Sequence, residues 1–288
     1  MPDLRPYIVL GIALGSVFAV SGVGMVVLYR ATGVLNLAYG AVGALGSLVA
    51  WSMINVFLLP DWLAYIVAVL LGGVASLLYG LLFGPPLAQR DPLVKAVATL
   101  GFLLILLGIM SWVWTDKAHA LILPTTEWGF SIGTAEVTVT QVLGLALAVV
   151  VTALATVFLR VTKLGTAMRA LANDREITAM QGVPVRRVEA AAWFGSGLLS
   201  GATGLLLSTL VGLDAVTLTF LVIAALSAAL VGRLQSLWIT LAAGLVIGVI
   251  QSVLTPFNAI SPYRAATPFV VAIIVLLWFA RRRPQVVR

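Results

Sequence analysis

Residues 162–189 read TKLGTAMRALANDREITAMQGVPVRRVE and form the longest polar stretch of the chain. Long apolar runs precede and follow it, so we expect it to lie in water between two membrane spans. The stretch carries five cations, Lys163, Arg169, Arg175, Arg186 and Arg187, among which lie Asp174, Glu176 and Glu189. A solvated loop that only fixes membrane orientation would carry a similar excess of positive charge.

The centre of this stretch predicts a short helix of about two to three turns. Asn173 or Asp174 can cap its start by accepting a hydrogen bond from a free backbone N–H. Ile177 and Met180, three residues apart, would share one face. Gly182 suits the left-handed position after a helix, and the proline two residues later prevents continuation. Ordinary connections are shorter, which favours a docking element.

The composition is that of an integral membrane protein. Hydrophobic residues make up 61% of the 288 positions and charged residues only 9%, against about 25% charged in soluble domains. The net charge of +7 does not indicate nucleic-acid binding, because the basic residues gather at the ends of apolar runs. The sequence contains no cysteine, which excludes disulfides and thiol chemistry.

Nine candidate spans predict an all-α, polytopic transmembrane bundle of about 8–9 helices in a single domain, residues 1–288. The second span could partly re-enter the membrane, because it opens on Asn36 and is rich in glycine. The pairs Gly11–Gly15, Gly197–Gly201 and Gly244–Gly248 would let helix backbones approach closely. The predicted spans are residues 7–29, 37–58, 62–83, 94–114, 140–159, 189–211, 215–232, 237–256 and 266–280.

The basic residues predict an external N-terminus and a cytoplasmic C-terminus. With this orientation only Arg5, Lys117 and Arg264 of the 17 basic residues fall outside, as the positive-inside rule requires. Residues 162–188 then form a cytoplasmic loop and residues 115–140 an external one. The external loop has the alternation and glycines of a small β-hairpin over residues 129–139. That hairpin either contacts a partner or only closes the loop.

The absence of several motifs from the sequence argues against some classes of function for this chain. His119 lies alone, without other metal ligands nearby in the sequence. There is no GxxxxGK[ST] motif and no catalytic constellation. The span centres have almost no ionisable residues, whereas proton- or sodium-driven carriers place them there. We therefore expect no cofactor and no enzymatic activity, and a transporter that takes its energy from another subunit.

Two stretches resemble the inner-membrane permeases of branched-chain amino acid ABC transporters. Residues 33–46, GVLNLAYGAVGALG, resemble that family's GxxNFAHG segment, with Leu37 and Tyr39 in place of phenylalanine and histidine. The polar stretch resembles the family's loop that docks on the ATPase. The family's GGxGS turn keeps only Gly232 and Ser236 here. The resemblance covers nearly the whole chain.

The resemblance implies a permease subunit of the bacterial cytoplasmic membrane for branched-chain or related hydrophobic amino acids. It also implies a second, homologous permease, two ATPases that bind the ATP, and an external binding protein. The residues expected to couple to an ATPase are Asn173, Asp174, Arg175, Glu176, Ile177, Ala179, Met180 and Gly182. Those expected along the substrate path are Asn36, Tyr39, Gly40 and Thr99.

Other interpretations remain open from the residues alone. Asn36 could equally cap the helix that follows it, and Thr99 could bond a neighbouring helix. The chain could be a permease or self-sufficient facilitator for urea or short-chain amides, which would equilibrate solute without ATP. It could also be a scaffold without transport activity. Sugar is a minor possibility as the substrate, because ribose-type permeases show a more distant resemblance.

Overall fold

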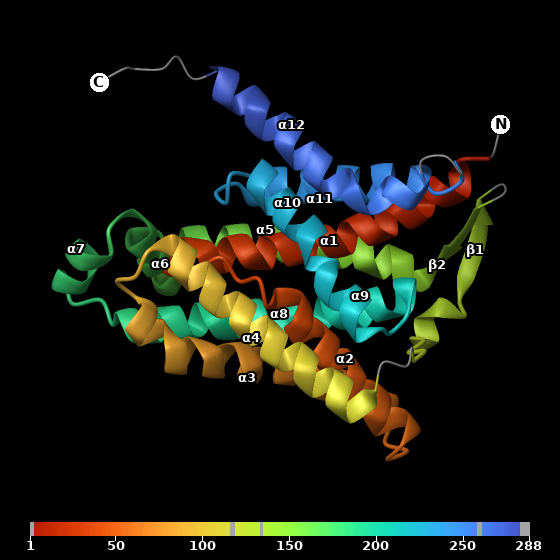
Figure 1. Ribbon diagram of the computed structural model, residues 1–288, viewed down its shortest axis with the longest axis horizontal. Helices are drawn as coiled ribbons and strands as arrows, with labels where there is room; N and C mark the ends of the chain where they lie inside the picture. The colour runs from red at the N-terminus through yellow and green to blue at the C-terminus, as the bar shows by residue number, and fades with distance from the viewer. Residues whose placement is uncertain (1–2, 116–118, 133–134, 258–260, 283–288) are drawn as a thin grey trace.

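A computed structural model describes residues 3–115, 119–132, 135–257 and 261–282. The described chain is a helical bundle with one small hairpin (Figure 1). The helices up to the polar stretch are α1 (Arg5–Thr32), α2 (Tyr39–Asn55), α3 (Asp61–Leu87), α4 (Pro92–Trp114), η1 (Pro124–Thr126) and α5 (Val139–Val161). Those that follow are α6 (Lys163–Asn173), α7 (Arg175–Met180), α8 (Val185–Val211), α9 (Ala215–Phe220), α10 (Val222–Val231), α11 (Leu237–Val253), η2 (Ser261–Ala266) and α12 (Thr267–Arg282).

Every predicted span coincides with helical structure, as expected for a membrane bundle. Five helices, α1, α3, α4, α5 and α8, are long and apolar enough to cross a bilayer. The segment over Ala215–Val231 and helix α11 are shorter apolar elements. The seventh predicted span is not one straight helix, because α9 and α10 are interrupted at Leu221. The chain is therefore a multi-pass membrane protein.

Helix α1 is the central element of the bundle, packed against α11, α8, α5 and α10. Its contact with α11 is close because glycines face the partner backbone on both helices. A Cβ on Gly15 would lie 2.7 Å from the Cα of Leu245, and one on Gly248 would collide with the backbone of Gly15. The glycine pairs of the sequence thus mark helix contacts, as predicted.

A second tight contact joins α8 to α2 and α3. A Cβ on Gly72 would lie 2.5 Å from the carbonyl oxygen of Gly197, and one on Gly201 would lie 2.7 Å from that of Ala68. Gly204 and Gly43 oppose each other in the same way between α8 and α2. Helices α1, α2, α3 and α8 consequently form a closely packed unit, on which helices α6 and α7 and the hairpin are carried.

The bundle has two distinct ends (Figure 1). Helices α6 and α7 lie at one end, beside the C-terminal end of α1. The hairpin lies at the opposite end, close to the start of α1. The α7 end also contains the C-terminal ends of α3 and α5 and the N-terminal ends of α4, α8 and α11. The loops that carry most basic residues are therefore gathered at this end.

The hairpin predicted over residues 129–139 is confirmed, with one change. Strands β1 (Gly129–Ile132) and β2 (Ala135–Thr138) pair antiparallel, with Phe130 opposite Val137. Val139 was expected in the second strand but begins α5. The reason is a capping box, in which the hydroxyl of Thr138 accepts from the N–H of Gln141 and the Gln141 side chain accepts from the N–H of Thr138.

Candidate functional site

The polar stretch forms two helices, whereas one of two to three turns was predicted. Helix α6 was missed, although Leu164, Met168 and Leu171 follow a helical spacing, and the last two are buried against the bundle. Helix α7 has six residues, fewer than two turns. Of the two candidate caps, Asp174 fills the role: its Oδ1 accepts from the N–H of Ile177 at 2.9 Å.

The outer face of α7 is exposed and partly apolar. Ile177 is 51% exposed and Met180 is 79% exposed. Thr178 faces inward and donates from its hydroxyl to the carbonyl of Asp174 at 2.6 Å. Gly182 follows the helix with a φ of 80°, the left-handed value predicted for it. The other exposed residues of the segment 173–182 are Asn173, Asp174, Glu176, Ala179, Gln181 and Gly182.

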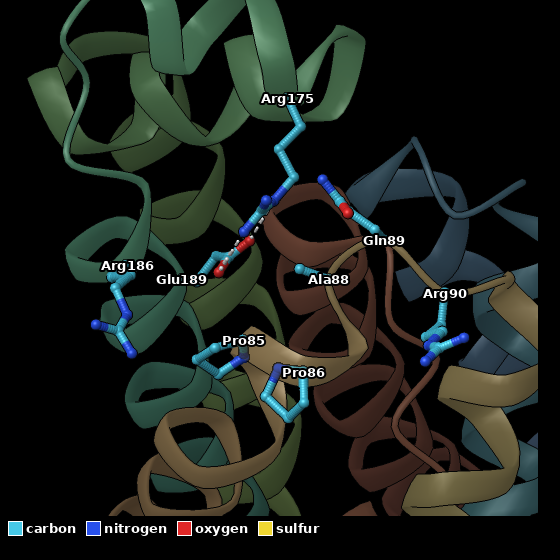
Figure 2. A pocket seen from close by; sticks show the side chains of 8 residues that line it. All are labelled: Pro85, Pro86, Ala88, Gln89, Arg90, Arg175, Arg186 and Glu189. Carbon is cyan, nitrogen blue, oxygen red and sulfur yellow. Dashed lines mark hydrogen bonds and ion pairs between the residues drawn. The ribbon is translucent and has the colours of Figure 1, made fainter.

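Arg175 connects α7 to the first turns of α8 (Figure 2). Its Nε donates to Oε1 of Glu189 at 3.0 Å, and its Nη2 donates to Oε2 at 3.3 Å. Arg175 was expected to bind a groove on a partner, but its guanidinium is engaged within the chain. The pair borders a cavity of about 510 Å³ between the α3–α4 connection, α7 and α8. Its lining comprises Pro85, Pro86, Ala88, Gln89, Arg90, Arg175, Arg186 and Glu189.

Two of the expected substrate-path residues hold a buried loop together. The hydroxyl of Thr99 on α4 accepts from the N–H of Leu37 at 3.1 Å and lies 2.9 Å from the carbonyl of Leu35. Asn36 is 3% exposed, and its Oδ1 accepts from the N–H of Ala38 at 3.1 Å. Both side chains therefore bond the backbone of the loop that precedes α2. Asn36 closes a turn within this loop and does not cap α2, whose N-cap is Ala38, and Thr99 bonds the loop rather than a neighbouring helix.

The other two, Tyr39 and Gly40, lie where α2 meets α8 and α9. Tyr39 is 2% exposed, and its carbonyl accepts from the hydroxyl of Ser200 at 2.6 Å. Gly40 faces the backbone of α9 so closely that a Cβ would collide with the carbonyl of Thr219. Both residues line a cavity of about 20 Å³, room for roughly one water molecule. The four path residues do not line one common cavity.

The hairpin end carries an apolar cavity of about 480 Å³ between α2 and α4. The ring of His119 lies over Trp51 with a centroid distance of 3.9 Å, and its backbone pairs with Leu213. Trp114 donates from Nε1 to the hydroxyl of Ser52 at 2.6 Å. Within the described ranges no group of three or more His, Cys, Asp or Glu side chains could hold a metal ion.

Comparison with known proteins identifies the family to which this arrangement belongs. Residues 7–278 match the family described as "Branched-chain amino acid transport system / permease component". The chain belongs to this family. The match extends from α1 to within α12, so the membrane helices and the polar stretch of residues 162–189 are covered together.

Individual relatives of this permease are moderately similar over most of their length. The permease protein LivH of the high-affinity branched-chain amino acid transport system of Escherichia coli K12 is 25% identical, covering 93% of this chain and 91% of the relative. The corresponding BraD protein of Pseudomonas aeruginosa is 25% identical, with coverages of 96% and 95%. A probable LivH of Methanocaldococcus jannaschii is 27% identical, with coverages of 82% and 76%.

The turn between α10 and α11 has left-handed backbone at two residues that are not glycine. Arg233 and Leu234 have φ values of 55° and 53°, in the left-handed region that favours glycine. The N–H of Leu234 donates to the carbonyl of Ala229 at 2.9 Å, as in a helix-terminating turn. Ser236 then caps α11 by accepting from the N–H of Ile239 at 3.3 Å.

Proposed function

We propose that this permease is one subunit of an ATP-driven importer of branched-chain or related hydrophobic amino acids in the bacterial cytoplasmic membrane. Its partners would be a second, homologous permease, two ATPases and an external binding protein. The observation that carries the proposal is α7: a capped helix, exposed on one face and joined to α8 by an ion pair on the other.

The geometry of α7 fits the docking of an ATPase. Ile177 and Met180 are exposed apolar side chains on a polar segment, where they would form the apolar centre of an interface. Thr178 and Arg175 bond to neighbouring backbone and to α8, so a force on α7 would pass to the start of a long helix. We propose that residues 162–188 act in this way as the coupling loop.

The proposed orientation places the α7 end in the cytoplasm and residues 115–140 outside. The concentration of basic residues near the helix ends on the α7 side supports it. The start of α1 and the hairpin lie at the opposite end, where a binding protein would deliver its cargo. The number of spans, about 8–9, remains part of this proposal, since α2, α11 and α12 are 17, 17 and 16 residues long.

The proposed substrate class follows from the relatives, whose names specify branched-chain amino acids. We place the path near Tyr39 and Gly40, beside the small cavity at the junction of α2, α8 and α9. Asn36 and Thr99 would act by holding the loop that precedes α2. A path with hydroxyls and few charges would let a zwitterion with an aliphatic side chain pass without trapping it.

Transport in vesicles tests the proposal directly. The permease would be reconstituted with its partner permease, the two ATPases and the binding protein, and uptake of labelled leucine would be followed with and without ATP. Deletion of residues 173–181 should abolish ATP-driven uptake while leaving the membrane bundle folded. The milder I177S/M180S variant should reduce both uptake and ATPase retention about tenfold, because it removes the apolar contact.

The control is K163S/Q181S, which alters two exposed residues of the same loop outside the apolar face and should retain uptake within about twofold. Undiminished uptake by I177S/M180S would overturn the docking role of α7. Equilibration of leucine, urea or acetamide by the permease alone, without ATP, would instead establish the facilitator alternative.

A further inference from the structure

Two cavities at the α7 end share a pair of arginines. The first, called here the inner basic cavity, has a volume of about 690 Å³ and lies between the ends of α1 and α6 and the start of α4. The second, the rim cavity, has a volume of about 320 Å³ and lies between the end of α5 and the start of α11. Arg30, Arg169 and Gln235 line both.

The charged side chains that line these two cavities are all positive. The inner basic cavity is also lined by Lys95 and Arg175, and the rim cavity by Arg160. No aspartate or glutamate lines either cavity. Among the described residues the ion pair at this end joins Arg175 to Glu189, which leaves Arg30 and Arg169 without a carboxylate partner. A bound anion would offset the repulsion between like charges held together in this way.

The hydrogen bonds of the two arginines are long and leave donors free. Arg30 donates from Nη1 to the carbonyl of Gln235 at 3.4 Å. Arg169 donates from Nη2 to the carbonyl of Arg160 at 3.5 Å and to the hydroxyl of Thr166 at 3.4 Å. The Nε of Arg169 is buried and has no partner among the described residues. A buried donor of this kind normally has an acceptor, and an oxygen of a bound anion would supply one.

The rim cavity lies where the apolar outer faces of two helices end. Val157 on α5 is 57% exposed, and Ile239 on α11 is 49% exposed. Trp238, in the first turn of α11, is 48% exposed and lines the cavity. Tryptophan with this exposure is typical of the membrane–water interface. This tryptophan would set the cavity at the level of lipid headgroups, with exposed apolar surface of α5 and α11 directly beside it.

We propose that Arg30, Arg160 and Arg169 bind the phosphodiester group of an anionic phospholipid whose acyl chains lie along α5 and α11. The guanidinium groups offer paired donors that match phosphate oxygens. The amino-terminal end of α11, with its partial positive charge, adds to the same site. Basic pockets at this level between transmembrane helices are suited to anionic headgroups. The proposal does not depend on the substrate or on the ATPase partners.

Native mass spectrometry of the full-length permease in detergent, titrated with phosphatidylglycerol or phosphatidylcholine, measures this binding. Phosphatidylglycerol should bind preferentially to the wild-type protein. The R30Q/R169Q variant should bind it roughly 10- to 30-fold more weakly. R30K/R169K retains the charge and should lose only about threefold. Helical circular dichroism and gel-filtration elution establish that each variant is folded.

The matched control is R186Q/R187Q, which removes two charges from the same end of the molecule but outside both cavities. It should leave phosphatidylglycerol binding within about twofold of wild type. Equal losses in the two double variants would show a diffuse surface-charge effect and would overturn the proposal. Unchanged binding by folded R30Q/R169Q would do the same.

Thermal unfolding with inorganic phosphate distinguishes the two sources of a phosphate group. Phosphatidylglycerol should raise the melting temperature of the wild type, whereas the same concentration of inorganic phosphate should not. An equal, Arg169-dependent rise with phosphate alone would overturn the assignment to a lipid. I177S/M180S should keep its lipid binding, so failure of the ATPase docking and failure of the lipid site give different results.

Discussion

The guanidinium of Arg175 and the carboxylate of Glu189 face each other across the space between α7 and α8, with Nε and Oε1 3.0 Å apart and Nη2 and Oε2 3.3 Å apart (Figure 2). Glu189 is 15% exposed and Arg175 is 38% exposed. Two parallel hydrogen bonds fix the direction of α7 as well as its distance from α8. The ion pair thus attaches the short surface helix α7 to α8 and, through α8, to the bundle.

Removing the charge of Glu189 should loosen α7 without unfolding the bundle. E189Q replaces a paired charge by an amide, and an uncompensated Arg175 then faces the cavity. We expect ATP-driven leucine uptake to fall about three- to tenfold. This corresponds to a loss of roughly 1 kcal/mol from the free energy that holds α7 in its orientation. The variant R175E/E189R, in which the two charges are exchanged, should recover part of the lost uptake. R186Q, which removes a charge from the same cavity, is the control, and equal uptake by E189Q and R186Q would contradict the role of the ion pair.

The N-cap of α7 should determine the fraction of molecules in which this helix is formed. D174A removes the acceptor for the N–H of Ile177, which costs about 1 kcal/mol at a helix start. Amide hydrogen exchange of residues 175–180 should become roughly fivefold faster. D174N retains an acceptor oxygen and should remain close to wild type. Equal exchange in the alanine and asparagine variants would show that the cap does not hold the helix.

Thr99 should contribute more to stability than a threonine that bonds only its own helix. T99V leaves the N–H of Leu37 without its acceptor and removes a hydroxyl that lies within hydrogen-bond distance of the carbonyls of Leu35 and Ala96, at a cost of about 1–3 kcal/mol. The control T209V removes a single hydroxyl that bonds the carbonyl of Leu205 in the same helix. Thermal unfolding in detergent should give a lower melting temperature for T99V than for T209V; the reverse order would contradict this assignment.

Adding a single methyl group to the contact between α1 and α11 should destabilise the folded protein. In G248A the new Cβ would collide with the backbone of Gly15 and with the carbonyl of Gly11, and separating the helices should cost more than about 2 kcal/mol. G101A is the matched control, because a Cβ on Gly101 in α4 meets nothing within 4 Å. It should be neutral or slightly stabilising. Equal melting temperatures for the two variants would show that the bundle can adjust at this contact.

Much of the architecture could be predicted because lipid restricts the possible structures. An apolar run near 20 residues has no other stable form than a helix, so each predicted span coincides with helical structure. The hairpin and the left-handed backbone of Gly182 were also predicted, since turn geometry depends on local residues. Helix α6 was missed because it has only 11 residues and lies in a stretch that was interpreted as a polar loop, although the spacing of Leu164, Met168 and Leu171 contained the signal.

The amino-acid sequence by itself determined the membrane class, the polar segment between two spans, a cap at Asn173 or Asp174 and the glycine pairs that allow close approach, because each depends on residues close together in the chain. The tertiary structure decided which of the two residues is the cap and which helix each glycine pair contacts. Only the tertiary structure decided that Arg175 pairs with Glu189, that Thr99 bonds the loop before α2, and that Arg30 and Arg169 border the same cavities. Such pairs join residues from different helices, and their distances are set by how the helices pack. No spacing along the chain encodes that packing directly.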